Sequence, residues 1–238
     1  MRLARTLGRT LPRILARALG ELLVTAGAVL ALFGGYQLLW TNVIAAEAQR
    51  ELTGDLRRSW DGPDLAPRPA GQPGEPAAGT GLALLHIPRL GAGWVRPVVQ
   101  GVEAAALAQG VGHYAQTALP GQVGNFAMAG HRATHGEPLR YLDQMRTGDA
   151  VIVETRDTWF TYQVRADPTV VATTALQVIA PARGDARPVP GERLLTLTTC
   201  HPRWSSERRM IVHATLVEER PRTHGPPPAL TATLAGGA

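Results

Sequence analysis

The 238-residue chain contains no lysine and a single cysteine. Its 24 basic residues are all arginine, which is typical of a protein encoded by a GC-rich genome. One cysteine cannot form a disulfide within the chain or build a zinc site from paired cysteines. The sequence also lacks an internal repeat and a glycine-rich phosphate-binding loop. These absences leave the lone cysteine, Cys200, as the feature that needs an explanation.

The basic excess lies at the N-terminus. The first 20 residues carry no acidic side chain and five arginines, which are Arg2, Arg5, Arg9, Arg13 and Arg17. These account for the whole formal net charge of +5, because residues 21–238 carry 19 arginines and 19 acids. A nucleic-acid-binding domain would place its basic patch on the fold itself, so the high isoelectric point does not indicate one. We interpret residues 1–21 as a cytoplasmic basic tail.

A long uncharged stretch follows the tail, from Leu22 to Ala46. About 20 apolar residues are enough for a helix to cross a membrane, and Tyr36 and Trp40 suit its interface. The preceding arginines predict a single-pass anchor over residues 22–46, with the N-terminus cytoplasmic and the rest outside the cell. The alternative is a cleaved signal peptide, because Ala46-Glu47-Ala48 resembles a cleavage site. Signal peptides have apolar regions of only about 7–15 residues, so the length favours an anchor.

The residues after the anchor divide into three parts by composition. Residues 47–80 are expected to form a stalk and linker, because residues 61–80 carry five prolines and four glycines. Residues 81–219 are expected to form one folded domain, and residues 220–238 a disordered tail. Outside the cell, an unpaired cysteine is either a reactive thiol or a buried, inert side chain. Composition alone leaves both interpretations of Cys200 open.

Short strand signals dominate the folded part. Runs of β-branched and apolar residues predict strands over residues 82–87, 95–100, 125–129, 150–155, 159–165, 194–200 and 210–217. Helical patterns are confined to residues 103–110 and 138–145. The fold class is therefore mostly β, either a sandwich or a closed barrel.

One histidine is distinguished by its context. His131 follows the strand-like run "NFAMAG" and opens a polar loop, "HRATHGEP". Loops at strand ends often carry catalytic groups. His131, His135 and Glu137 also resemble a metal site, but Thr134, Gly136 and Pro138 indicate a loop without the helical spacing that such a site needs. We expect no metal and no cofactor.

Three motifs in order resemble the sortases, the membrane-anchored cysteine transpeptidases of Gram-positive cell surfaces. "TLTTC" matches the family's cysteine signature at Cys200, "AMAGHR" matches its histidine segment at His131, and "RMIVHA" matches its arginine-led strand at Arg209. The match covers residues 82–218. The stretch "GVGHYAQTALPGQVGNFAMAGHR" is most similar to class E, the housekeeping-type branch of high-GC Gram-positive bacteria.

The resemblance implies a sortase-like closed β-barrel with a few short helices, and a division of catalytic roles. Cys200 would attack the Thr–Gly carbonyl of a Leu-Ala-x-Thr-Gly or Leu-Pro-x-Thr-Gly sorting signal, and His131 would act as general acid and base. Arg209 would stabilise the oxyanion, with Thr199 and Tyr114 as substrate-binding residues. The partners would be secreted proteins that carry the signal and a peptidoglycan or lipid-linked precursor amine.

Three alternatives remain at this stage. Arg208 rivals Arg209, although only one of two neighbours on a strand can face Cys200. The same site could hydrolyse the thioester instead of transferring the acyl group. The domain could also be a non-catalytic, membrane-anchored β-domain that binds wall or surface protein, but the ordered His–Cys–Arg set argues against this.

Overall fold

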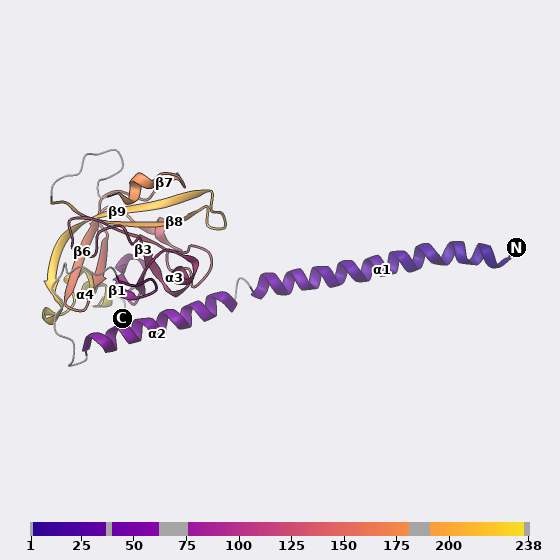
Figure 1. Ribbon diagram of the computed structural model, residues 1–238, viewed down its shortest axis with the longest axis horizontal. Coiled ribbons are helices and arrows are strands. Elements are labelled where there is room, and N and C mark those ends of the chain that lie inside the picture. Colours follow the sequence, from indigo (N-terminus) through magenta and orange to yellow (C-terminus); the bar gives the residue numbers. More distant parts are fainter. Residues whose placement is uncertain (1, 37–39, 62–75, 181–190, 236–238) are drawn as a thin grey trace. The chain divides into compact units, whose positions relative to one another are not determined.

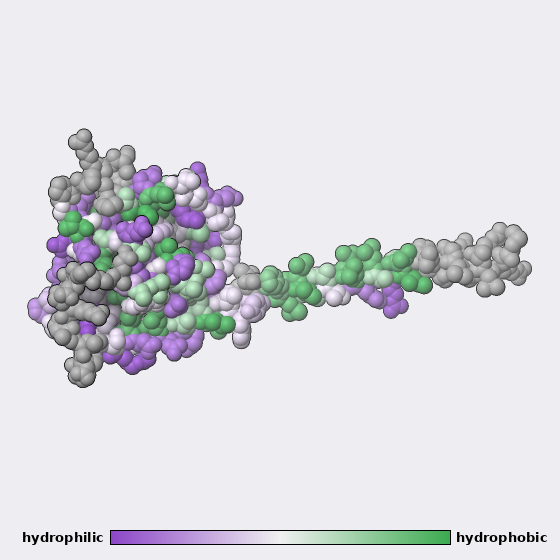
Figure 2. Space-filling view, in the orientation of Figure 1, coloured by the Kyte–Doolittle hydropathy of each residue, from purple (hydrophilic) through white to green (hydrophobic). Residues whose placement is uncertain are grey.

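The computed structural model describes residues 2–36, 40–61, 76–180 and 191–235, and it divides into two compact units, Met1–Asn42 and Val43–Ala238. The first unit contains helix α1 (Arg2–Gly35), whose large apolar side chains between Ile14 and Phe33 are exposed (Figure 2). Its segment Arg13–Gly35 is long and apolar enough to cross a membrane. This segment differs from the expected anchor over residues 22–46, because α1 ends at Gly35 and helix α2 (Thr41–Asp61) starts a few residues later.

A closed β-barrel forms the body of the second unit (Figure 1). The strands are β1 (Gly81–His86), β2 (Val95–Gln100), β3 (Val111–His113), β4 (Gly124–Ala129), β5 (Ala150–Glu154), β6 (Thr158–Val164), β7 (Thr169–Ala172), β8 (Arg193–His201) and β9 (Arg208–Pro221). Their order in the sheet is β6-β5-β1-β2-β3-β4-β8-β9-β7. A further pairing of β6 with β9 closes eight of the described strands into a barrel and leaves β7 as an added edge.

The closure depends on the length and bend of β9. Its first half pairs with β8 and β7, and its second half pairs with β6. The β6–β9 register skips Val217, because Tyr162 pairs with Leu216 whereas Thr161 pairs with Glu218. Such a bulge bends a strand and increases its twist, which lets one strand serve both sides of a barrel. The bulge also interrupts the alternation of apolar residues, so the sequence pattern ends at residue 217 although the strand continues to Pro221.

The hydrophobic core fills the barrel. Alternate residues of β4, β8 and β9 point inward, and this set comprises Phe126, Met128, Leu195, Leu197, Met210 and Val212. Tyr162 from β6 is also fully buried, and its hydroxyl accepts a hydrogen bond from the Gly121 backbone at 2.9 Å. Burial raises the pKa of Tyr162 to about 12. Because strand residues alternate, the intervening positions of β4, β8 and β9 face away from this core.

The expected mostly-β fold and all seven predicted strands are confirmed. Two short strands, β3 and β7, lack a sequence signal: β3 has three residues around a glycine, and β7 pairs only with β9 and is largely exposed. Helix α3 (Ala104–Gln109) matches the predicted helix, whereas the pattern over residues 138–145 gives only the 3₁₀ turn η3 (Leu142–Gln144). The other 3₁₀ turns are η2 (Pro88–Leu90), η4 (Leu176–Ile179) and η5 (Arg222–His224).

The C-terminal segment is more ordered than its composition suggested. Instead of a disordered tail from residue 220, the chain completes β9, forms η5 and continues into helix α4 (Pro228–Ala235). Leu230 of α4 is buried in a small cluster with Ile152 and Trp159 on the outside of the barrel. One buried leucine contributes roughly 1.5–3 kcal/mol. This packing explains why a proline-rich segment without a periodic apolar face still has a defined place.

Candidate active site

Two of the three expected catalytic residues lie on neighbouring strands, Cys200 on β8 and Arg209 on β9, and His131 lies in the loop two residues after β4 ends at Ala129. Cys200 is directly opposite Arg209 in the antiparallel β8–β9 ladder. On the other side of β8, Ala129 pairs with Thr198 in parallel register. The Ala129 pair is the last of the β4–β8 ladder, but the Gly130 amide still donates to the Thr198 carbonyl at 3.1 Å, so the chain runs alongside β8 as it approaches His131. Since neighbouring strands lie about 4.7–4.9 Å apart, this arrangement places the histidine segment on one side of Cys200 and Arg209 on the other.

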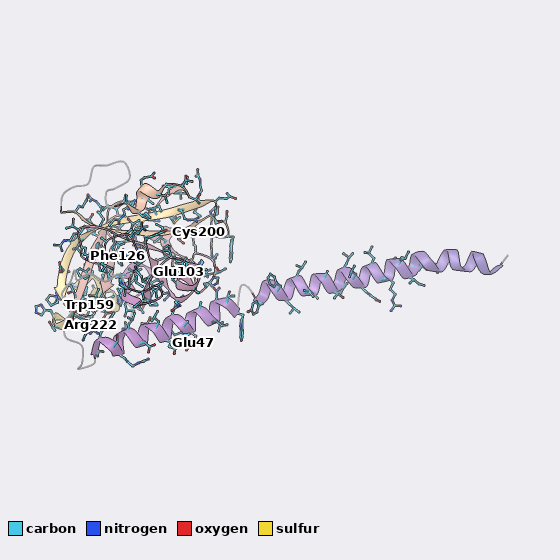
Figure 3. The ribbon with its side chains drawn as sticks, in the orientation of Figure 1. Glu47, Glu103, Phe126, Trp159, Cys200 and Arg222 are labelled. Atoms are coloured by element: carbon cyan, nitrogen blue, oxygen red, sulfur yellow. The ribbon has the colours of Figure 1, made fainter. Side chains whose placement is uncertain are left out.

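Cys200 lies on the outer face of the barrel, near the end of β8 (Figure 3). Leu195 and Leu197 point into the core, so the alternation turns Cys200 and Thr198 outward. The thiol residue is partly exposed. This position contradicts the alternative of a buried, inert cysteine, and it makes the sulfur accessible to a substrate.

Two hydrogen bonds fix the segment of His131 against the segment of Cys200. The Thr199 hydroxyl, one residue before the cysteine, donates to the Gly130 carbonyl, one residue before the histidine, at 2.7 Å. Arg132, one residue after the histidine, donates to Nδ1 of His201, one residue after the cysteine, at 2.9 Å. Both catalytic positions are therefore held between paired neighbours.

Arg132 is the central residue of the second tie. Its side chain is 8% exposed, and it also pairs with Asp143 at 3.3 Å. Arginine can only donate, so Nδ1 of His201 is the acceptor in this hydrogen bond. With these partners, the buried Arg132 side chain restricts the distance between the histidine loop and the loop that follows Cys200.

Glu137 makes a further tie between the same two loops. Both of its carboxylate oxygens accept from Nη2 of Arg203 at 2.9 Å, and Arg140 pairs with it at 2.8 Å. The ring of His135 stacks on the ring of His131, with 4.7 Å between centroids. The Glu137 carboxylate is thus occupied by arginines, and the two imidazoles face each other. The described residues contain no group of three acidic, histidine or cysteine side chains that suits a metal ion.

The environment of His131 favours its neutral form. Burial lowers the pKa of His131 below its ordinary value, and the charge of the neighbouring His135 lowers it further. Both effects disfavour a second positive charge at this position. His131 therefore holds a proton less firmly than a solvent-exposed histidine does.

The two adjacent arginines of β9 have different surroundings. Arg209 is opposite Cys200 and half-buried, whereas Arg208 is opposite His201 and exposed. Nη1 of Arg209 donates to the carbonyls of Ser206 and Arg208 at 3.0 and 3.1 Å. These bonds use one nitrogen of the guanidinium group, and the described residues provide no acceptor for the others. The register thus supports Arg209 as the cation beside the thiol.

Tyr114 and Thr199, the two expected substrate-binding residues, differ in their contacts. The Tyr114 hydroxyl is 3.2 Å from the hydroxyl of Thr198, which shares the outer face with Cys200. Tyr114 is partly exposed there. The Thr199 side chain is buried and directed at Gly130, so its hydroxyl supports the histidine segment.

Sequence reasoning missed three residues of the site, Arg132, His201 and Arg203, and it considered Glu137 only as a metal ligand. Their contacts join positions 66 and 69 residues apart, so no local pattern reveals them. The adjacency of Arg132 to His131, and of His201 to Cys200, was the only available signal. This adjacency predicts a contact between Arg132 and His201 only once the β4–β8 register is known.

The site can now be compared with known proteins. A sortase-domain family model matches residues 85–217. The chain belongs to the sortase family. Over 224 residues it is 40% identical to sortase SrtE1 of Streptomyces coelicolor, covering 91% of this chain and 61% of that protein. This sortase thus spans less than two thirds of that relative's length.

Solved structures agree with this assignment. Sortase E from Streptomyces avermitilis is 42% identical, with a TM-score of 0.60 over 65% of this chain and 99% of that one. Sortase E1 from S. coelicolor, solved with a tripeptide in its active site, is also 42% identical, with a TM-score of 0.58 over 64% and 97% of the two chains.

The strand register predicts that the two arginines will differ sharply in importance. Arg209→Ala should lower the rate of thioester formation by about 100- to 1000-fold, the usual cost of losing an oxyanion donor. Arg209→Lys should recover little, because a point charge cannot replace a planar fork. Arg208→Ala is the matched control and should retain near-normal activity, since exposed arginines contribute little. Rates are compared with one peptide at fixed concentration. A crippled Arg208→Ala beside an active Arg209→Ala would show that the register is shifted by one residue.

The stacked histidines predict a defined change in the acid–base behaviour of His131. His135→Asn removes a charge that lowers the pKa of His131, so this pKa should rise, and the limb of the pH–rate profile that reports it should move to higher pH. Asparagine suits the position because His135 has a φ of 54°, which asparagine tolerates. The measurement is an NMR titration of His131. His224→Asn, at an exposed position in η5, should leave the value unchanged. A lower or unaltered pKa in His135→Asn would contradict this account.

Proposed function

We propose that this sortase is a membrane-anchored transpeptidase that cleaves a C-terminal sorting signal between threonine and glycine. The acyl group is then transferred to a cell-wall amine. The single observation that carries the proposal is the strand register, which sets Arg209 opposite Cys200 on one side of β8 and ends β4 two residues before His131 on the other side. This arrangement would offer a nucleophile, a proton carrier and an anion-stabilising donor at one end of the sheet.

In the first half-reaction, the thiol of Cys200 gives its proton to His131, and Sγ attacks the carbonyl carbon of the Thr–Gly bond. The carbonyl oxygen becomes an oxyanion that Arg209 stabilises by hydrogen bonding. The C–N bond then breaks, and His131 gives its proton to the departing glycine amine. The product is a thioester between Cys200 and the substrate threonine. The lowered pKa of His131 eases the release of this proton.

In the second half-reaction, an amine attacks the thioester carbon and transfers its proton to His131. A new amide bond forms, the C–S bond breaks, and the Cys200 thiolate is released. The acceptor is an amine of peptidoglycan or of its lipid-linked precursor. Water in place of the amine would give hydrolysis from the same intermediate.

Tyr114 is the residue that we assign to signal selectivity. Its hydroxyl sits against Thr198, two residues before the nucleophile and on the same face. If the second residue of a bound signal lies near the ring of Tyr114, alanine at that position would meet less steric obstruction than the rigid ring of proline. This supports Leu-Ala-x-Thr-Gly as the preferred signal over Leu-Pro-x-Thr-Gly.

The reaction predicts a trapped intermediate. The full chain in detergent micelles should form a thioester with a Leu-Ala-x-Thr-Gly peptide, detected by mass spectrometry as an added acyl mass on Cys200. Cys200→Ala should form none while keeping its melting temperature, and His131→Ala should lose turnover. A glycine or diaminopimelate acceptor should convert the intermediate to a ligated product. Either variant at wild-type activity would remove that residue from the mechanism, and release of free acid despite excess acceptor would indicate a hydrolase.

The anchor predicts the location of the catalytic domain. The apolar helix is compatible with a single membrane span, and the arginines before it favour a cytoplasmic N-terminus. The barrel should therefore lie outside the cell and remain membrane-bound. Protease added to intact protoplasts should digest residues 81–235. A protected barrel would reverse the topology, and a mature protein in the medium that starts near Glu47 would indicate a cleaved signal peptide.

A further inference from the structure

Helix α2 presents a buried polar residue to the barrel. Within the second unit, Ala45, Gln49 and Leu56 are the buried residues of this helix, and their spacing of four and seven places them on one face. Gln49 is only 5% exposed, although glutamine is mostly found on surfaces. Glu47, which Figure 3 labels on α2, has 68% of its side chain exposed. A buried amide of this kind needs a hydrogen-bond partner to offset its desolvation.

That partner is the loop of the candidate catalytic histidine. Nε2 of Gln49 donates to the carbonyl of His135 at 3.1 Å. The same nitrogen also lies against Gly136, where an added Cβ would approach it to 2.8 Å. The helix that precedes the barrel in sequence thus contacts the backbone of the His131 loop directly.

This loop has a conformation that requires external support. Three consecutive residues have positive φ values, 54° at His135, 77° at Gly136 and 46° at Glu137. For residues other than glycine, this conformation costs roughly 1–2 kcal/mol each. Arg203 and Arg140 hold the loop at Glu137, and Gln49 holds it at His135. The contact from α2 therefore stabilises the part of the loop that is nearest to the stacked imidazoles.

Two further contacts fix α2 along its length. Leu56 packs so closely on Gly81 at the start of β1 that an added Cβ would lie 2.9 Å from it. At the end of the helix, Arg222 pairs with Asp61 at 2.9 Å and lies 5.4 Å over the ring of Trp60. The position of Gln49 is thus set by contacts on the rest of its helix.

We propose that α2 contributes to the active site by holding the His131 loop, and that Gln49 is a positioning residue for His131. Gln49 holds the carbonyl of His135, the ring of His135 stacks on that of His131, and His131 is thereby kept in line with Cys200. This inference rests on the catalytic role proposed above for His131. It adds that the helix next to the membrane anchor in the sequence sets the efficiency of proton transfer.

Replacing the amide without emptying its space tests this role. Gln49→Met keeps the length of the side chain but removes the donor, in the full chain in detergent micelles. A net hydrogen bond is worth about 1 kcal/mol, so kcat should fall about three- to tenfold while KM for the sorting peptide stays unchanged. The His131 ring resonances should also shift in NMR spectra. Glu47→Ala, on the exposed side of the same helix, should match the wild type in both measurements.

The contact of Gln49 with Gly136 allows a double-mutant test. Gly136→Ala should lower kcat, because the new methyl group meets Gln49 and the φ is positive. Gly79→Ala is the matched control, since Gly79 has a φ of 79° and open space around its Cβ position. In a Gln49→Ala background, Gly136→Ala should cost clearly less than in the wild type, because the obstructing amide is gone.

The outcomes separate this inference from the proposed function. An inactive His131→Ala enzyme beside a Gln49→Met enzyme with wild-type kcat and unshifted His131 resonances would refute the role of α2 alone. Strict additivity of Gln49→Ala and Gly136→Ala would also refute it. If His131→Ala keeps the wild-type rate, the proposed function fails instead.

Discussion

The parallel pairing of β4 with β8 is the constraint on which the site depends. These strands are far apart in the sequence, and their register sets which residue of one segment lies beside Cys200 on the other. A shift by one residue would turn His131 away, because alternate strand residues face opposite sides of a sheet. The hydrogen bonds Thr199–Gly130 and Arg132–His201 lie on either side of the catalytic pair and prevent such a shift. The core side chains Met128 and Leu197 oppose it as well, since they would be driven outward.

The antiparallel β8–β9 pairing places the third candidate residue, and β9 also closes the barrel. Its N-terminal half sets Arg209 opposite Cys200, and its C-terminal half pairs with β6 beyond the bulge at Val217. Closure leaves no free edge on the strands of the barrel itself. The candidate catalytic arginine, Arg209, thus lies on a strand that is paired on both sides, with β8 and with β7. A rigid backbone at this position reduces the reorganisation needed when the oxyanion forms.

The sequence indicates candidate catalytic residues but not the contacts that hold their segments. Cys200, His131 and Arg209 stand in motifs that can be read locally, and the seven predicted strands follow from alternation and β-branched runs. Arg132 and Glu137 could not be assigned, because their partners lie 66 and 69 residues away and depend on the strand register. The C-terminal helix was missed for a similar reason. Leu230 has no amphipathic pattern around it, and its place is decided by Trp159 and Ile152 on other elements.

The packing of helix α2 changes the interpretation of residues 47–80 as a stalk and linker. From composition, residues 47–80 read as a stalk that lets a catalytic domain move away from its anchor. In the structure, Leu56 of α2 instead packs against Gly81, the first residue of the barrel. Asp61, the last residue of α2, pairs with Arg222. Helix α2 is therefore part of the packed unit and not a stalk that leads to it. Only residues 36–40 separate α1 from α2 in the sequence, so the unit that carries the candidate site begins soon after the candidate membrane span along the chain.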